Sequence, residues 1–306
     1  MLKPRLGCLP RPPPPIRCPA FRYLHSPLFL GADFFYAGKP RLYASLAFIS
    51  ISFKLIYLTA LHWTTEYLDR VRELDLNIAG DAKASRILES LLGESDLGDL
   101  SRLISGYPVL ICGCGPSLEN DLHKIVEHRL HERFVLVAVD GAVKGFLDYR
   151  IVPHINVTDL DGDVNSILRA NSYGCITVVH AHGDNIDSLS SVVPHLEGRV
   201  LGTTQHRPTP KLHNFGGFTD GDRACYLVDH FKPSFIVLAG MDFGSVVGVY
   251  SHSYNQIKKP RKLRIGKKLI QELASKSPTR FFNVTSSGEH IEGVRHISFE
   301  KLSYLI

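Results

Sequence analysis

The hydrophobic positions of the chain fall into two kinds of block. Short, mostly apolar runs stop abruptly at Gly, Asp, Thr or His, as strands buried on both faces of a parallel sheet do. Segments with apolar residues at helical spacing separate these runs. The alternation predicts an α/β fold with a Rossmann-like, mostly parallel sheet and helices on both of its faces. The runs lie at 108–112, 134–139, 155–157, 175–180, 199–203 and 234–239.

Residues 62–105 have a different pattern. Apolar residues recur there at helical spacing, with charges between them, from Trp63 to Leu92. We therefore expect two or three amphipathic helices that form an N-terminal helical cap. The main α/β domain then occupies 106–306.

Residues 1–61 form an extension of unusual composition. The first 40 residues are rich in Pro and basic residues without periodicity, which favours disorder. Residues 42–61 are apolar over about the length of one membrane span. They fit a membrane anchor or uncleaved signal, a buried helix, or a segment absent from the natural product because translation starts downstream. Lys54 and several Ser and Thr residues weaken the first interpretation, so we expect no membrane association.

Charge and cysteine content narrow the function classes. The net charge of +5 is concentrated in residues 1–60, where eight Lys and Arg accompany one Asp. The remaining chain is thus mildly acidic, at about −2, which argues against a broad nucleic-acid surface. Six cysteines in 306 residues do not make a disulfide framework, so we expect reduced, buried thiols and a cytoplasmic location. A homo-oligomer is left open.

Carboxylates follow two neighbouring strands of the predicted sheet. Asp140 follows the run at 134–139, and Asp159, Asp161 and Asp163 follow the run at 155–157. Ligands collect at the carboxyl ends of parallel strands, and clustered carboxylates suit Mg²⁺, which bridges to phosphates. We interpret these residues as the metal end of a phosphate-transfer site. The alternative is an Asx-turn cluster in which Asp163 caps the next helix.

A glycine loop joins the first strand to a helix. It reads Gly113-Cys-Gly115-Pro-Ser117, with Ser117 as the expected N-cap. Small residues at a helix start let backbone N–H groups approach an anion, which would make this loop a phosphate cradle. The alternative is that the glycines only let the strand pack closely on its helix.

Other strand ends also carry polar residues. The spacing of His180 and His182 resembles a metal site, but no third soft ligand is near, so substrate hydrogen bonds are favoured. Asp220 and Asp222 follow Thr219, the expected cap of a helix. They either interact favourably with the helix dipole or face the same cation or nucleotide as the other acids. The basic cluster at 258–268 is mainly a solvated face, with one or two residues able to reach phosphates. No Walker A, G-x-S-x-G or H-E-x-x-H sequence occurs, which excludes P-loop kinases, α/β-hydrolases and zincins.

Six blocks in order resemble one family, the archaeal 6-hydroxymethyl-7,8-dihydropterin pyrophosphokinases of the MptE type. The resemblance extends from about Trp63 to the C-terminus and includes the basic segment, whereas residues 1–60 lie outside it. The blocks are CGCGPSLEND (112–121), AVDGA (138–142), PHINVTDLDGD (153–163), HAHGDN (180–185), NFGGFTDGDRA (214–224) and LAGMDFG (238–244).

The resemblance implies transfer of diphosphate from ATP to the hydroxymethyl group of a reduced pterin, with release of AMP. It places this reaction in tetrahydromethanopterin or folate-type cofactor synthesis. Mg²⁺ would be the cofactor, with Asp140, Asp159 and Asp161 catalytic and Asp159, Asp161 and Asp163 as metal ligands. The nucleotide- or phosphate-binding residues would be Gly113, Gly115, Ser117, Asp220, Asp222, Lys258 and Lys262. The pterin contacts would be His182, Asp184 and Gln205.

Three other functions share some of these features. The thiamine pyrophosphokinases have a similar DG…P…TDLDGD arrangement, but no counterpart of their small C-terminal sandwich domain is evident. Nucleotide-sugar transferases use a DxD metal motif, but proteins of that kind in this superfamily are usually much longer. A non-catalytic nucleotide-binding module is the third, and the acids at several strand ends argue against it.

Overall fold

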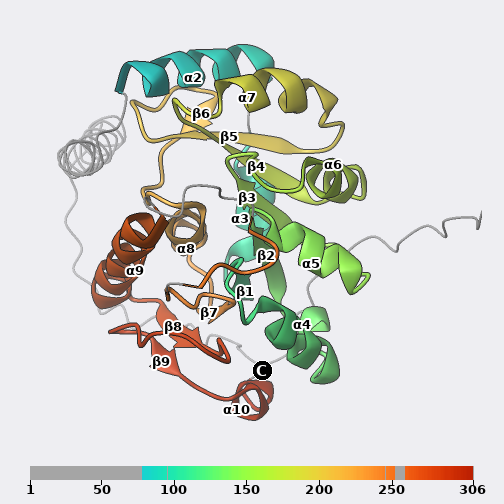
Figure 1. Ribbon diagram of the computed structural model, residues 1–306, viewed down its shortest axis with the longest axis vertical. Coiled ribbons are helices and arrows are strands. Elements are labelled where there is room, and N and C mark those ends of the chain that lie inside the picture. Colours follow the sequence, from blue (N-terminus) through green and yellow to red (C-terminus); the bar gives the residue numbers. More distant parts are fainter. Residues whose placement is uncertain (1–77, 95, 245, 252–258, 306) are drawn as a thin grey trace, which may run out of the picture. The chain divides into compact units, whose positions relative to one another are not determined.

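The computed structural model describes residues 78–94, 96–244, 246–251 and 259–305. Within these residues, nine strands form one sheet in the order β6-β5-β4-β3-β2-β1-β7-β8-β9 (Figure 1). Every neighbouring pair is parallel. The strands are β1 (Pro108–Cys112), β2 (Val135–Val139), β3 (Ile155–Thr158), β4 (Ile176–Ala181), β5 (Val200–Thr204), β6 (Leu212–His213), β7 (Phe235–Ala239), β8 (Arg280–Asn283) and β9 (Arg295–His296).

Helices cover both faces of this sheet, as the sequence predicts. Figure 1 shows α5 and α6 on one side of the strands and α8 and α9 on the other. The helices of the described residues are α2 (Ile78–Leu91), α3 (Gly98–Ile104), α4 (Leu118–Glu127), α5 (Ala142–Asp148), α6 (Val164–Ser172), α7 (Ile186–Val192), α8 (Asp220–His230), α9 (Lys259–Lys276) and α10 (Phe299–Ser303). The α/β fold class is therefore confirmed.

Strand β1 shows why the sheet needs both layers. Leu110 and Cys112 pack into the apolar layer formed with α2, α4, α5, α6, α7 and α10. Val109 and Ile111 point the other way, into the layer formed with α3, α8 and α9. All four side chains are fully buried, and burying each aliphatic one stabilises the fold by about 1.5–3 kcal/mol. A continuous apolar run is thus the sequence of a strand with no solvent face.

The two helices before β1 lie in different layers. Helix α2 packs against α7, β4 and β5, with Ala84 and Leu88 buried. Helix α3 buries Leu100 and Ile104 in the opposite layer. Two helices of the predicted N-terminal helical region are therefore present and packed on the sheet. The predicted features of residues 1–61, including the apolar segment, lie outside the described residues. No helix among the described residues has both the length and the apolar character that a membrane crossing requires.

The order of the strands fixes where a ligand can lie. From β1 the chain builds outward through β2 to β6, then returns to place β7 on the other side of β1. The loops after β1 and β7 therefore leave the sheet in opposite directions. Such a switch point opens a crevice at the carboxyl ends of the strands, which is the usual ligand position in open α/β sheets.

Candidate functional site

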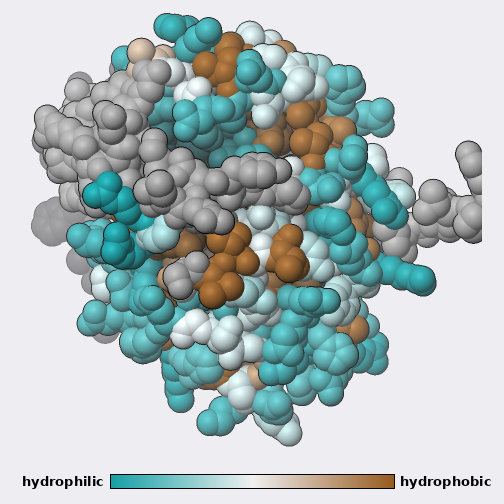
Figure 2. Space-filling view, in the orientation of Figure 1, coloured by the Kyte–Doolittle hydropathy of each residue, from teal (hydrophilic) through white to brown (hydrophobic). Residues whose placement is uncertain are grey.

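A cleft lies at this edge of the sheet. Its walls come from the segments that follow β1, β2, β3, β4, β5 and β7, from the start of α8 and from α9. The loop residues that link β7 to α9 contribute exposed apolar side chains, including Val246 and Val247. Figure 2 shows apolar side chains among hydrophilic ones across the middle of one face of the molecule. The cleft therefore combines charged groups on its floor with apolar groups at its rim.

Three carboxylates meet on the floor of the cleft. Asp140 follows β2, and Asp159 and Asp161 follow β3; one oxygen from each lies within 4.8 Å of the other two. We call these three residues the acid group. Asp140 is buried, Asp159 is half-buried and Asp161 is exposed, so the group is open to the cleft from one side.

The backbone after β2 and β3 is shaped to bring these acids together. Asp140 (φ 46°) and Leu160 (φ 68°) both adopt the left-handed conformation, which turns each strand sharply at its end. The Thr158 hydroxyl donates to Asp140 Oδ1 (2.9 Å) and accepts from the Leu160 N–H (2.8 Å). Gly162 is needed because a Cβ there would lie 2.7 Å from Asp140 Oδ1. The strand ends thus hold the acids at fixed positions.

The pKa values show that three negative charges do not coexist easily here. Burial and the nearby Asp159 raise the pKa of Asp140. Although Asp161 is exposed as a residue, desolvation of its carboxyl group and the charges of Asp140 and Asp159 raise its pKa to about 10. Burial opposes the charge of Asp159 too, but its hydrogen bond to His182 lowers its pKa to about 2. A proton or a cation must therefore neutralise part of the acid group, and its all-oxygen donor set suits a hard divalent ion.

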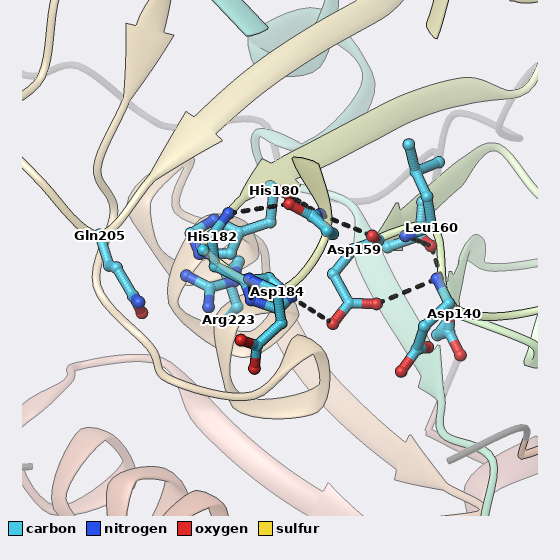
Figure 3. A network of polar contacts seen from close by, with 12 residues as sticks. Asp140, Asp159, Leu160, His180, His182, Asp184, Gln205 and Arg223 are labelled. Carbon is cyan, nitrogen blue, oxygen red and sulfur yellow. Dashed lines mark hydrogen bonds and ion pairs between the residues drawn. The ribbon is translucent and has the colours of Figure 1, made fainter. Parts of the chain in front are cut away.

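His182 holds Asp159 rather than extending into open space. Its Nε2 lies 3.1 Å from Asp159 Oδ2, and its Nδ1 accepts from the Asp184 N–H at 3.2 Å. The proton of the neutral ring therefore lies on Nε2 and is donated to Asp159. Asn185 adds a bond from Nδ2 to the Asp159 carbonyl oxygen (2.6 Å). Figure 3 shows this chain of contacts running from the histidines toward Asp140. The structure thus gives His182 a positioning contact with an acid, while the Asp184 side chain is exposed at the rim.

Asp163 does not join the acid group. Its side chain accepts from the Ser166 N–H at 2.7 Å and caps α6. The cause is local, because a chain that enters a helix three residues later offers that carboxylate an unsatisfied backbone donor. The structure therefore brings Asp140, Asp159 and Asp161 together and leaves Asp163 apart from them, at the start of α6.

The glycine loop is built differently from the expected phosphate cradle. Gly113 and Gly115 line the cleft, but Ser117 does not. The Ser117 N–H and hydroxyl both bind Asp242 Oδ2, at 3.3 and 2.8 Å. The N-terminus of α4 is therefore already occupied by a carboxylate of the protein. Ser117 stands at the N-cap position, yet its side chain makes no capping bond to the helix.

Gly115 explains how the loops after β1 and β7 fit together. A Cβ at this position would come 2.5 Å from the Gly240 carbonyl oxygen and still closer to the Asp242 carboxylate. The glycines thus allow close packing, which was the alternative interpretation of this loop, and they also line the cleft.

The start of α8 separates its two acids. Asp220 lines the cleft, where burial and the charges of Asp159 and Asp140 raise its pKa. Asp222 instead forms a capping box with Thr219 and accepts from the Phe218 N–H at 2.5 Å. Asp222 is therefore a structural residue of the helix start, and the structure does not place it in the cleft.

Of the two lysines expected to bind phosphate, Lys262 lines the cleft, and its charge helps to lower the pKa of Asp159. Lys258 lies outside the described residues.

Comparison with known proteins identifies the family. A family model described as "6-hydroxymethylpterin diphosphokinase MptE-like" matches residues 85–248, more than half of the chain. The chain belongs to the MptE-like family. Three relatives are each named 6-hydroxymethyl-7,8-dihydropterin pyrophosphokinase. The one from Methanocaldococcus jannaschii is 35% identical over 235 residues, covering 72% of this chain and 97% of the relative.

The other two relatives are similarly close to this MptE-like chain. That from Methanothermobacter thermautotrophicus is 39% identical over 192 residues, covering 62% of this chain and 80% of the relative. The relative from Pyrococcus furiosus is 38% identical over 221 residues, covering 69% of this chain and 92% of the relative. The resemblance found in the sequence blocks is therefore confirmed.

Sequence reasoning missed several residues of this MptE-like cleft. Asp81 of α2 accepts from the Gly183 N–H (2.7 Å) and from Gln205 Nε2 (2.9 Å), which fixes the expected pterin contact Gln205 in place. Arg223 is buried and lines the cleft, as does His180, for which substrate hydrogen bonds were already expected. Arg223 belongs to the FTDGDRA block, so a sequence signal was present but gave no direction for the side chain. Asp81 lies in a helix that carries no motif, and only the fold brings it here.

Proposed function

We propose that this chain transfers diphosphate from ATP to the hydroxymethyl group of 6-hydroxymethyl-7,8-dihydropterin, with release of AMP, and that the transfer requires Mg²⁺. The observation that carries the proposal is the acid group on the floor of the cleft of an MptE-like chain. Three relatives named for this pterin substrate support it. The product would serve the synthesis of a tetrahydromethanopterin or folate-type cofactor.

The reaction requires that both substrates are positioned and that the negative charge of the phosphates is neutralised. The hydroxymethyl oxygen attacks the β-phosphorus of ATP, and the bond from that phosphorus to the α,β-bridging oxygen breaks. AMP leaves with the bridging oxygen, and the hydroxyl proton is released. No covalent bond to the protein is required, so the residues act by orienting both substrates and by balancing charge.

Asp140, Asp159 and Asp161 fit a magnesium ion. Their oxygens are close enough to share one ion, and a bound cation would offset the burial and mutual repulsion that raise the pKa values of Asp140 and Asp161. A bound Mg²⁺ would neutralise the phosphates of the nucleotide and hold them in line. Lys262 adds a cation from α9 on the same side of the cleft.

From the order of the strands we assign each substrate its own part of the cleft. The acid group follows β2 and β3, the glycine loop follows β1, His180 lies near the end of β4, and Gln205 follows β5. Strands lie about 4.8 Å apart, so the floor from β5 to β7 spans roughly 24 Å. That length accommodates a nucleotide on the β1 and β7 side and a bicyclic ring on the β4 and β5 side, with the acid group between them.

Product analysis tests the proposal. Purified full-length protein is incubated with ATP, Mg²⁺ and 6-hydroxymethyl-7,8-dihydropterin, and the products are separated by liquid chromatography and mass spectrometry. We expect AMP and the pterin diphosphate in equal amounts, and no turnover in EDTA. Formation of ADP would show a monophosphate transfer and overturn the proposal, as would turnover of thiamine in place of the pterin. Full activity in EDTA would overturn the metal requirement alone.

A further inference from the structure

Two buried polar atoms in the cleft have no hydrogen-bond partner among the described residues. They are His180 Nε2 and Arg223 Nε. His180 is the penultimate residue of β4 and is 1% exposed, and Arg223 on α8 is 3% exposed. The other unpartnered buried atoms in the described part of the chain belong to His131 and Asn156, which do not line the cleft. Buried polar groups are normally satisfied, so this pair indicates a missing ligand.

The hydrogen bonds of His180 determine what its free nitrogen can do. The Thr203 hydroxyl donates its one hydrogen to the Val179 carbonyl oxygen at 3.2 Å. It must therefore accept from His180 Nδ1, which lies 3.1 Å away. Burial, with the charge of Arg223, holds the pKa of His180 well below its ordinary value, so the ring is neutral. The tautomer is then Nδ1–H, and Nε2 remains as a hydrogen-bond acceptor without a partner in the buried wall of the cleft.

Arg223 supplies the complementary group. Its terminal nitrogens donate to the Phe218 carbonyl oxygen (2.9 Å) and, at the long distance of 3.5 Å, to that of Gly217. These bonds fix the guanidinium and leave Nε–H as a donor. No ion pair among the described residues includes Arg223, so its charge is balanced only at longer range by acids such as Asp220. The cleft wall thus holds one buried acceptor and one buried cationic donor, and the charge of Arg223 acts on His180.

We infer that His180 and Arg223 bind the lactam edge of the pterin ring, with the ring N3–H donating to His180 Nε2 and the C4 carbonyl oxygen accepting from Arg223 Nε–H. This inference rests on the proposed function. The inner phosphates of a nucleotide fit poorly, because their oxygens are all acceptors and would meet the lone pair of His180. A lactam presents a donor next to an acceptor, as this pair requires.

The position of the pair agrees with the reaction. Figure 3 shows His180, His182 and Arg223 gathered between Gln205 and Asp159. The His180 and His182 rings stack with centroids 6.2 Å apart. A pterin whose lactam edge lies at this end of the cleft can direct its hydroxymethyl group toward the acid group. Phe218, which lines the cleft beside Arg223, offers an aromatic face for the ring.

Two substitutions of His180 separate the acceptor from the rest of the ring. His180→Asn keeps a group that can donate to Thr203 but lacks the acceptor at the Nε2 position. His180→Gln places an amide oxygen near that position. Binding of 6-hydroxymethylpterin is measured by quenching of its fluorescence, without ATP or Mg²⁺, and ATP binding is measured separately by calorimetry. We expect the pterin Kd to rise on the order of 10- to 100-fold in His180→Asn and less than about 5-fold in His180→Gln, with ATP affinity unchanged in both.

An unchanged pterin Kd in His180→Asn would overturn the inference, and so would an equal loss of pterin affinity in the two variants. A loss of ATP affinity in place of pterin affinity would also overturn it, because it would put the adenine edge at this pair. If His180→Asn fails to fold, the wild-type protein decides the matter with N3-methylated 6-hydroxymethylpterin, which lacks the N–H. We expect that analogue to bind on the order of 100-fold more weakly, and equal binding would refute the assignment. These binding results do not depend on catalysis, so a protein that binds pterin in this way but forms no AMP would refute the proposed function and leave the inference intact.

Discussion

Replacing Asp161 with Asn separates metal binding from folding. Asp161 belongs to a group of carboxylates whose oxygens lie within 4.8 Å of one another. Two unit charges at that distance repel by about 3 kcal/mol at an effective dielectric constant of about 20, and the pKa of Asp161, raised to about 10, means that this carboxyl group keeps its proton at neutral pH when no metal is bound. The free protein gains nothing from this charge. We therefore expect Asp161→Asn to melt at the same temperature as the wild type, or slightly higher, when no metal is present.

When Mg²⁺ is present, the wild type should melt at a higher temperature than Asp161→Asn. At a concentration of about 100 times its Kd, a ligand stabilises the folded state by about 2.7 kcal/mol, which raises Tm by roughly 5–10 °C in a domain of this size. If the loss of one carboxylate weakens Mg²⁺ binding about 100-fold, the same Mg²⁺ concentration stabilises the folded variant by only about 0.4 kcal/mol. The corresponding rise in Tm is less than about 2 °C. Diphosphate transfer should fall by at least about 100-fold in the same variant. Thermal melts with and without Mg²⁺ measure the first effect, and AMP release measures the second.

Asp163→Asn is the matched control. It removes the same formal charge two residues further along, but Asn caps helices about as well as Asp, and Asp163 caps α6 outside the acid group. This variant should keep both the magnesium shift and the activity. The reasoning fails if Asp161→Asn retains the full magnesium shift, or if Asp163→Asn loses as much of it.

Three further predictions concern the surroundings of the acid group. His182→Ala removes the hydrogen bond that orients one acid, so kcat should fall about 10- to 100-fold with a smaller change in KM for the pterin, and a larger change in KM than in kcat would contradict this. Lys262→Ala should raise KM for ATP about 10-fold in steady-state assays, whereas Lys268→Ala, which removes an exposed surface residue, should leave it unchanged. Gly115→Ala should lower the free energy of unfolding by more than about 2 kcal/mol in denaturant titrations, because its Cβ overlaps the β7 loop, whereas Gly93→Ala, with open space around it, should have little effect.

The hydrophobic pattern alone predicted the architecture well. Strands β1 and β2 were evident because a strand buried on both faces must be apolar throughout, and residues such as Leu110 and Val137 are fully buried. Strand β6 was not predicted, because the two-residue strand Leu212–His213 is too short to carry a pattern. The spatial order of the strands could not be read either, since it depends on which strand returns beside β1.

The candidate site was predicted in part, for reasons that are also physical. The acid group could be anticipated because parallel strands end at the same edge of a sheet and strands that are consecutive in sequence are usually adjacent, which brings Asp140 and Asp159 together. Ser117 was assigned to phosphate because a helix start attracts anions, and nothing local to the loop shows that Asp242, 125 residues away, supplies that anion. His180 was expected to make substrate hydrogen bonds, but Arg223 was missed because a buried polar residue is recognisable only once its partners are known.

Manganese bound with an ATP analogue tests the central claim most directly. Crystals grown with Mn²⁺ and α,β-methylene ATP, which cannot release AMP, are measured at a wavelength where manganese scatters anomalously. The account predicts a peak within coordination distance, about 2.1–2.3 Å, of oxygens from at least two of Asp140, Asp159 and Asp161, with the phosphates on the same ion. Manganese bound only elsewhere, with the phosphates away from these three carboxylates, would contradict it.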